Sequence, residues 1–261
     1  MKSEVNVLYF SATGGTEKVI MEIAEKISDK INVYNITLSN NRLNYLNFGP
    51  NDVVIVGVPV YAGRIPEFLL DYFSTLQGNN TLAVFVTVYG NRDYDDALLE
   101  LKNTFENNGF KGIAAGAFIA EHSYTSLVGT NRPDTADLKL ARKFGEEIKA
   151  IIDENVNASL LRELFVKGSF PYKERSNLPP IVPSTNISCI NCGLCAKSCP
   201  VEAIDFNNFS VTNATKCISC CSCIKKCPVN AKFMNHELFA QITNRLIKNF
   251  STIRHEPEWF K

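Results

Sequence analysis

Nine cysteines lie within residues 189–227 of this 261-residue chain, and eight of them form a motif that occurs twice. The first copy has the spacing C-x2-C-x2-C-x3-C and consists of Cys189, Cys192, Cys195 and Cys199. The second copy starts 28 residues later (217 − 189 = 28) and consists of Cys217, Cys220, Cys223 and Cys227. A proline follows each copy, at Pro200 and Pro228. This internal duplication of ligand-type residues indicates two equivalent sites in one small unit.

The spacing is that of the bacterial cysteine run that binds [4Fe–4S] clusters, in which three thiolates bind one cluster and the fourth binds the other. It predicts one cluster on Cys189, Cys192, Cys195 and Cys227. It predicts the other cluster on Cys217, Cys220, Cys223 and Cys199. The ninth cysteine, Cys221, does not fit the spacing, so we expect a spare thiol, with a redox or alternate-ligand role as the alternative.

Other uses of clustered cysteines fit less well. Structural zinc prefers pairs of ligands separated by a dozen or more residues. A disulfide scaffold needs an oxidising compartment, and the N-terminus does not resemble a signal peptide, since Lys2 and Glu4 precede only a short apolar run. We therefore expect a cytoplasmic iron–sulfur protein, typical of an anaerobic or microaerobic organism.

The first part of the chain alternates short apolar runs with amphipathic helical patterns. We expect strands over residues 5–10, 31–38, 52–58, 82–88 and 113–120. We expect helices over residues 16–30, 66–77, 95–107 and 133–155. This alternation predicts an α/β domain with a doubly wound, five-stranded parallel sheet that is covered by helices on both faces.

Composition then divides the chain. We expect a first domain over residues 1–158, a short helix and proline-rich linker over 159–183 with the helix at 160–166, a cysteine-rich domain over 184–234, and a helical tail over 235–261. The tail has apolar residues at helical spacing, which favours a helix packed on the protein's own surface over a membrane-surface helix, because a strongly basic face is missing.

A glycine- and hydroxyl-rich loop connects the first expected strand to the first helix. It consists of Ser11, Ala12, Thr13, Gly14, Gly15 and Thr16. Backbone N–H groups and the helix dipole at such a position bind anions. No lysine follows the glycines and no G-x-G-x-x-G spacing is present, which argues against a nucleotide or dinucleotide loop. The loop suits a single phosphate monoester, and a tight turn without a ligand is the alternative.

On this loop and the five-strand count, the first domain resembles the flavodoxin family, whose phosphate loop binds FMN. The resemblance implies the sheet order 2-1-3-4-5, for which flavodoxin is the type example. It also implies two loops that contact the flavin ring, after the third and fourth strands. The first loop includes Pro59, Val60, Tyr61, Ala62 and Gly63. The second includes Tyr89, Gly90, Asn91 and Tyr94.

Within these loops, Tyr61 is the first choice for stacking on the flavin, and Tyr94 is the second. Arg64 and Arg92 either lie near the flavin or face solvent. His122, at the end of the fifth strand, is expected to be exposed, with a proton relay at the flavin edge as the alternative.

The cysteine-rich part resembles bacterial two-cluster ferredoxins, a small α+β fold, so the whole chain resembles a flavodoxin–ferredoxin fusion. Residues 1–160 contain 14 Lys and Arg and 20 Asp and Glu, whereas residues 161–261 contain 13 and 7, so charges of −6 and +6 cancel. The lysines of the cysteine-rich part are Lys197, Lys216, Lys225, Lys226 and Lys232. We expect them to face the acidic half or an acidic partner, and a scattered solvated surface is the alternative.

These parts predict an electron-transfer iron–sulfur flavoprotein that relays single electrons between two [4Fe–4S] clusters and FMN, as a low-potential redox carrier. The alternative is an FMN-dependent reductase of a small molecule such as a quinone or flavin. We expect redox proteins as partners, no nucleic acid and no membrane span, and the sequence leaves open whether the protein forms a homodimer.

Overall fold

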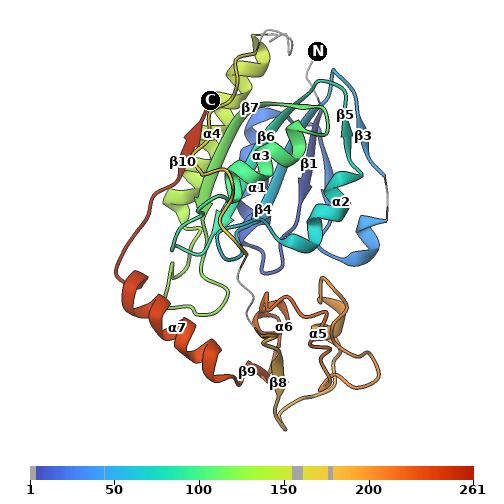
Figure 1. The fold of residues 1–261 in the computed structure, drawn as a ribbon, viewed down its shortest axis with the longest axis vertical. Helices are drawn as coiled ribbons and strands as arrows, with labels where there is room; N and C mark the ends of the chain where they lie inside the picture. Colours follow the sequence, from blue (N-terminus) through green and yellow to red (C-terminus); the bar gives the residue numbers. More distant parts are fainter. Residues whose placement is uncertain (1–3, 44, 155–160, 176–178) are drawn as a thin grey trace.

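The computed structural model describes residues 4–43, 45–154, 161–175 and 179–261. Its main element is a six-stranded sheet with the strand order β10-β7-β6-β4-β1-β2 (Figure 1). The parallel strands are β1 (Val5–Tyr9), β2 (Ile31–Asn35), β4 (Val53–Pro59), β6 (Thr81–Tyr89) and β7 (Phe110–Ile119). Numbered among themselves, these five strands have the predicted order 2-1-3-4-5, which confirms the flavodoxin-like fold.

Helices cover both faces of this sheet. Helices α1 (Gly15–Ile27) and α4 (Thr135–Asp153) pack together on one face, through residues such as Ile20 and Phe144. The other face is covered by η2 (Glu67–Leu69), α2 (Leu70–Ser74) and α3 (Ala97–Glu106). The central strands β4 and β6 are apolar along most of their length because both of their faces are buried.

Several helices are shorter than the pattern predicts. The segment expected as one helix over 66–77 becomes η2 and α2, and its end forms β5 (Gln77–Gly78), which pairs with β3 (Asn47–Phe48). The 3₁₀ helix η1 (Ser39–Arg42) lies between β2 and β3. The helix expected over 133–155 begins at Thr135, where Asp134 forms a capping box with Asp137. Its expected last residue, Asn155, lies outside the described residues.

The tail differs from the prediction. Only α7 (Glu237–Phe250) is helical, and β10 (Glu258–Phe260) joins the sheet as a sixth strand, antiparallel to β7. Trp259 packs on Phe118 and Phe144, with ring centroids 6.5 and 5.7 Å away. The tail therefore covers an edge of the sheet that would otherwise present unpaired backbone groups.

The expected helix at 160–166 is wrong for residues 161–166, which have no helical structure. Leu164 and Val166 are buried against the sheet, whereas Phe165 between them is 81% exposed. This alternation is satisfied by an extended chain and not by a helix. Residue 160 lies outside the described part, and the domain limits given above stay a prediction.

The cysteine-rich segment forms a small unit beside the sheet (Figure 1). It contains β8 (Pro183–Thr185), α5 (Leu194–Lys197), α6 (Ser222–Lys225) and β9 (Lys232–Met234). Strands β8 and β9 pair antiparallel, and an isolated bridge joins Ile204 to Thr212. The unit lies at the carboxyl ends of the parallel strands, where Arg42 and Glu121 of the larger domain contact it.

None of the helices within the described residues has the length and apolar character that crossing a membrane requires.

Candidate functional site

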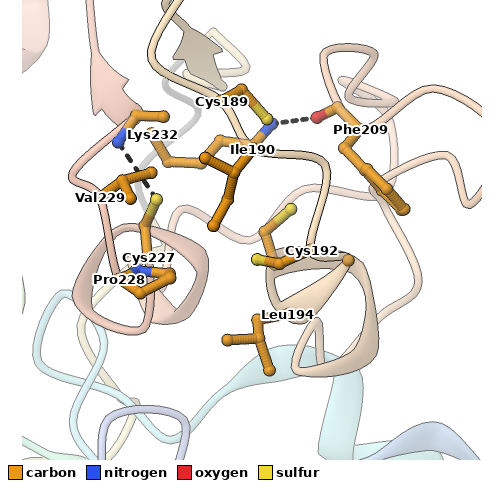
Figure 2. A pocket seen from close by; sticks show the side chains of 12 residues that line it. Cys189, Ile190, Cys192, Leu194, Phe209, Cys227, Pro228, Val229 and Lys232 are labelled. Atoms are coloured by element: carbon orange, nitrogen blue, oxygen red, sulfur yellow. Dashed lines mark hydrogen bonds between the residues drawn. The ribbon is translucent and has the colours of Figure 1, made fainter.

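Two cavities lie in the cysteine-rich unit, and each has four motif cysteines in its wall. The first is lined by Cys189, Cys192, Cys195 and Cys227, together with Ile190, Leu194 and Lys232 (Figure 2). The second is lined by Cys199, Cys217, Cys220 and Cys223, together with Cys221, Ile204 and Ile218. With their open mouths included, the cavities measure about 320 and 340 Å³. The structure thus brings together the two sets of four cysteines that the spacing predicts, and cluster binding by them stays a prediction.

The duplication extends to the backbone. Positive φ angles recur at an offset of 28 residues: Asn191 and Ser219 have φ of 54° and 52°, and Glu202 and Asn230 both have 52°. The fourth cysteine of each motif also makes the same hydrogen bond. Cys199 Sγ accepts the N–H of Ala203 at 3.2 Å, and Cys227 Sγ accepts that of Ala231 at 3.1 Å. The two sites are therefore built on one backbone plan.

This plan explains the position of the ninth cysteine. Cys221 corresponds to Gly193 (221 − 28 = 193), and both adopt the left-handed conformation before a short helix, with φ of 62° and 73°. The Cys221 thiol is buried and lines the second cavity. It therefore occupies a glycine position in the repeat.

The four cysteines of each cavity fit a cubane [4Fe–4S] cluster better than a single metal ion. In the part of the chain that the structure describes, no three His, Cys, Asp or Glu side chains lie close enough to share one metal ion. A [4Fe–4S] cluster takes four cysteine thiolates, so its ligands enclose a group of atoms. Burial raises the pKa of Cys220 and of Cys223 to about 12, so both would be neutral thiols at pH 7 without a bound cation.

The predicted phosphate loop connects β1 to α1. Ser11 holds its base, since the Ser11 N–H donates to Thr37 Oγ1 at 2.9 Å and Ser11 Oγ accepts the Glu17 N–H at 3.1 Å. Within the described residues, the backbone N–H groups of positions 12–16 donate to no protein acceptor. Consecutive free donors at the start of a 13-residue helix fit a bound phosphate.

Two glycines are required in this loop. Gly14 has φ of 91°, a conformation that other residues rarely adopt. A Cβ on Gly15 would lie 2.7 Å from the Cβ of Ala120, so only glycine lets α1 approach the end of β7 this closely. Thr13 is exposed at the mouth of the loop, and Thr16 is buried.

The first ring-contacting loop lies at the carboxyl end of β4, as predicted. Its residues Pro59, Val60 and Tyr61 are half-buried, and Ala62 and Gly63 form a tight turn with φ of 52° and 86°. Burial raises the pKa of Tyr61, and the neighbouring Cys220 and Cys221 raise it further when they are ionised. The predicted stacking residue therefore lies beside the second cavity.

The second ring-contacting loop differs from the prediction. The Tyr94 side chain is only 1% exposed and its hydroxyl donates to Glu258 at 2.6 Å, so this ring offers no open face for stacking. Tyr89 is also buried and packs on Tyr94, with ring centroids 5.7 Å apart. The expectation that Tyr94 stacks on a flavin is therefore wrong, because β10 covers it.

Asn91 is likewise committed to the tail. Its amide nitrogen donates to the carbonyl oxygens of Phe250 and Ile253, at 3.3 and 2.7 Å, and its side-chain oxygen accepts from Arg132 and the His255 N–H. This buried side chain holds the segment between α7 and β10, and no polar atom of it is left for a cofactor.

The surroundings of Arg64, Arg92 and His122 also differ from those expected. Arg64 donates to both carboxylate oxygens of Glu100, at 2.6 and 2.8 Å, and Arg92 pairs with Asp95, so both charges are neutralised locally. His122 is half-buried and not exposed. Burial lowers the pKa of His122 to about 4, and the nearby charges of Lys225 and Arg92 add to this.

Gly90 explains why His122 lies inside the structure. A Cβ on Gly90 would lie 2.5 Å from the imidazole ring, so glycine makes room for it. His122 Nδ1 accepts the Tyr124 N–H at 3.1 Å, and the Tyr124 ring lies 4.6 Å from that of Phe239 in α7. Sequence reasoning missed Tyr124, since a single aromatic residue in a loop carries no distinguishing pattern. Phe239 belongs to the apolar residues at helical spacing that predict a tail helix on the protein's own surface.

Within the described residues, packing, hydrogen bonds and an ion pair join the cysteine-rich unit to the larger domain. Ile218 and Cys220 pack against the same buried core as Tyr61. Arg42 donates to the carbonyl oxygen of Pro200 at 2.6 Å. Ser39 hydrogen-bonds Glu202, and Lys225 forms an ion pair with Glu121. Among the five lysines of the unit, Lys225 alone shows an ion pair across this boundary within the described residues. The five lysines as a group therefore do not pair with acidic residues of the larger domain, as one of the expectations had it.

Two family models match the chain. A flavodoxin domain matches residues 6–120, and a 4Fe-4S dicluster domain matches residues 182–228. No curated protein sequence matches the chain significantly.

Solved structures are similar to the larger domain. A flavodoxin from the domain Archaea is 13% identical, with 57% of this chain and 99% of that one covered and a TM-score of 0.41. A Fusobacterium nucleatum flavodoxin bound to flavin mononucleotide is 13% identical, with 59% and 99% covered and a TM-score of 0.40. Rubredoxin oxygen:oxidoreductase from Desulfovibrio gigas is 18% identical, with 58% and 36% covered and a TM-score of 0.42.

A flavodoxin domain implies FMN, and a 4Fe-4S dicluster domain implies iron–sulfur clusters. Both groups carry electrons, and both domains are present in one chain.

Proposed function

We propose that this flavodoxin–ferredoxin fusion is a redox carrier that relays single electrons between two [4Fe–4S] clusters and FMN. The observation that carries the proposal is the packing of Ile218 and Cys220, from the second cavity, against the flavodoxin domain next to Tyr61. This contact brings the wall of one cysteine site to the edge of the sheet where flavodoxin-like folds bind their ligand.

Bound in these sites, clusters exchange one electron at a time and FMN accepts one or two. The protein's part is to hold them. Four thiolates of each cavity would ligate one cluster, as the spacing predicts. The free N–H groups of positions 12–16 would hold the FMN phosphate, and the turn at Tyr61, Ala62 and Gly63 would contact the ring.

The two cavities differ in their surroundings, which supports an order for the relay. In the first cavity, Cys192 is exposed and Ile190 and Leu194 are 60% and 45% exposed. In the second, the equivalent residues Cys220, Ile218 and Ser222 are half-buried or buried. We therefore place the second site next to the flavin and the first site towards protein partners.

The reductase alternative needs a substrate space above the flavin and a proton donor. The tail helix α7 lies against Tyr124 through Phe239, which covers the loop after β7. His122 has a pKa lowered to about 4 by burial, Lys225 and Arg92, so it is neutral at pH 7 and a poor proton source. Both observations favour the carrier. Cysteines that bind clusters, and the ninth thiol of Cys221, also need a reducing compartment, which supports a cytoplasmic location.

The test is anaerobic reconstitution of the full chain, followed by iron, sulfide and flavin analysis and spectroelectrochemistry. We expect about eight irons and one FMN per chain. Many turnovers of quinone or free-flavin reduction with an excess electron donor, at a rate that saturates with substrate, would instead identify the reductase. A chain that binds no FMN, or far fewer irons, contradicts both functions.

A further inference from the structure

A lysine is buried in the wall of the first cavity. Lys232, at the start of β9, is 3% exposed, and its ammonium group donates to the carbonyl oxygen of Phe209 (Figure 2). Lys232 and Phe209 both line the cavity of Cys189, Cys192, Cys195 and Cys227. The lysine is therefore part of the site. It neither faces the acidic half, as expected, nor belongs to a scattered solvated surface, the alternative.

The second copy of the motif has a lysine where the first has an apolar residue. Lys232 corresponds to Ile204 (232 − 28 = 204), which is equally buried at 3% and lines the second cavity. Ile204 packs with Cys195 and Cys223 in the small core of the unit. The duplication thus predicts an apolar side chain at position 232, and the lysine departs from that pattern.

A buried ammonium group is costly unless opposite charge lies near it. In the described residues, no carboxylate lies within ion-pair distance of Lys232. The groups that line the cavity together with Lys232 are cysteines: Cys189, Cys192, Cys195 and Cys227. Thiolates that bear a cluster are the anionic partners that this lysine lacks.

We propose that Lys232 raises the reduction potential of the cluster on Cys189, Cys192, Cys195 and Cys227 above that of its duplicate. The inference rests on the proposed function. An oxidised cluster with its four thiolates carries a charge of about −2, and one added electron makes it about −3 without a proton or ligand change. A fixed cation in a site of low dielectric constant stabilises the more negative form more strongly.

The consequence is that two sites with the same backbone conformation would have different roles in the relay. The first site faces outwards, through Cys192, Ile190 and Leu194, and has the buried cation. The second site faces the flavodoxin domain and has Ile204 instead. An electron that arrives from a partner is therefore held at the outer site before it moves towards FMN.

The test uses the reconstituted full-length protein in a redox titration followed by electron paramagnetic resonance, with iron counted on every sample. Lys232→Ile copies the repeat residue, Lys232→Met keeps the side-chain length, and Lys232→Arg keeps the charge. Lys226→Met removes an exposed lysine next to Cys227 as the control. At a fixed potential, the Ile and Met variants should show a reduced-to-oxidised ratio at least tenfold lower for one cluster, a shift of about 59 mV for one electron.

The Arg and Lys226→Met variants should keep both wild-type potentials. Unchanged potentials in an iron-replete Ile or Met variant overturn this inference and leave the proposed function intact. A wild-type chain without the expected iron overturns the proposed function, and this inference with it. A shift of the reduction potential in Lys226→Met as large as that in the Lys232 variants contradicts a special role for the buried Lys232.

Discussion

The two copies of the cysteine motif have the same spacing and backbone, yet different neighbours. In the first copy, Ile190 and Cys192 are exposed, whereas their counterparts Ile218 and Cys220 pack against the flavodoxin domain. Buried positions differ too, since Gly193 corresponds to Cys221 and Ile204 to Lys232 (193 + 28 = 221; 204 + 28 = 232). The duplication therefore specifies how the four cysteines of each cavity are arranged, while the residues around each copy specify what a cluster bound there would contact and how its charge would be balanced.

The largest difference between the copies is expected when each loses a ligand. Cys192→Ser and Cys220→Ser should each reduce the iron content from about eight to about four per chain. Reduction of FMN by a low-potential donor should then slow at least tenfold more in Cys220→Ser, because that variant loses the site beside Tyr61. Stopped-flow absorbance measures this. Equal rates in the two variants would contradict the proposed order of the sites.

Acid should destabilise the protein through His122, which feels the charge of Lys225 in the second copy. Burial, Lys225 and Arg92 lower the pKa of His122 to about 4 in the folded chain, against an ordinary value of about 6.5. Between these values only the unfolded chain binds the proton, so stability falls as the pH decreases from 6.5, by about 1 kcal/mol at pH 5.5 and about 3 kcal/mol at pH 4.

The measurement is chemical denaturation of the reconstituted protein at several pH values, with His122→Gln for comparison. The variant should lose this part of the pH dependence. A wild-type profile that is identical to the variant's would show that His122 becomes protonated equally in both states.

A smaller effect is expected from the ion pair between the second copy and the flavodoxin domain. Lys225→Ala removes the partner of Glu121, a partly exposed pair, and should destabilise the protein by no more than about 1 kcal/mol. It should also weaken the salt dependence of electron exchange within the chain. Lys226→Ala, an exposed neighbour, should change neither quantity. Salt-independent exchange in the wild-type protein would exclude an electrostatic role for this contact.

The smallest effect concerns the ninth cysteine. Cys221→Ser should keep about eight irons, because Cys221 occupies the glycine position of the repeat and not a ligand position. Iron analysis after anaerobic reconstitution decides this, with Cys220→Ser as the ligand-loss comparison. Loss of iron from Cys221→Ser would place Cys221 among the ligands.

Local patterns were sufficient where the information is local. The periodicity of the apolar residues predicted all five parallel strands, and the spacing of the cysteines predicted which four surround each cavity. The loop at Ser11–Thr16 was found for the same reason, since its free N–H groups follow from a glycine-rich entry to a helix. The prediction that Tyr94 stacks on a flavin was wrong, and the Asn91 side chain is engaged elsewhere, because both contact a tail more than 150 residues away in the chain (250 − 91 = 159; 258 − 94 = 164).

By itself, the sequence determined the two domains, the five parallel strands and the duplicated cysteine plan, because period, spacing and turn chemistry act over a few residues at a time. The order of the strands was implied by the resemblance to the flavodoxin family and not by these local patterns. Only the tertiary structure decided that β10 closes an edge of the sheet, that the second copy and not the first contacts the flavodoxin domain, and that Lys232 is buried. These depend on which distant surfaces meet, and two identical motifs cannot show in sequence which of them is covered. The tertiary contacts make the copies different.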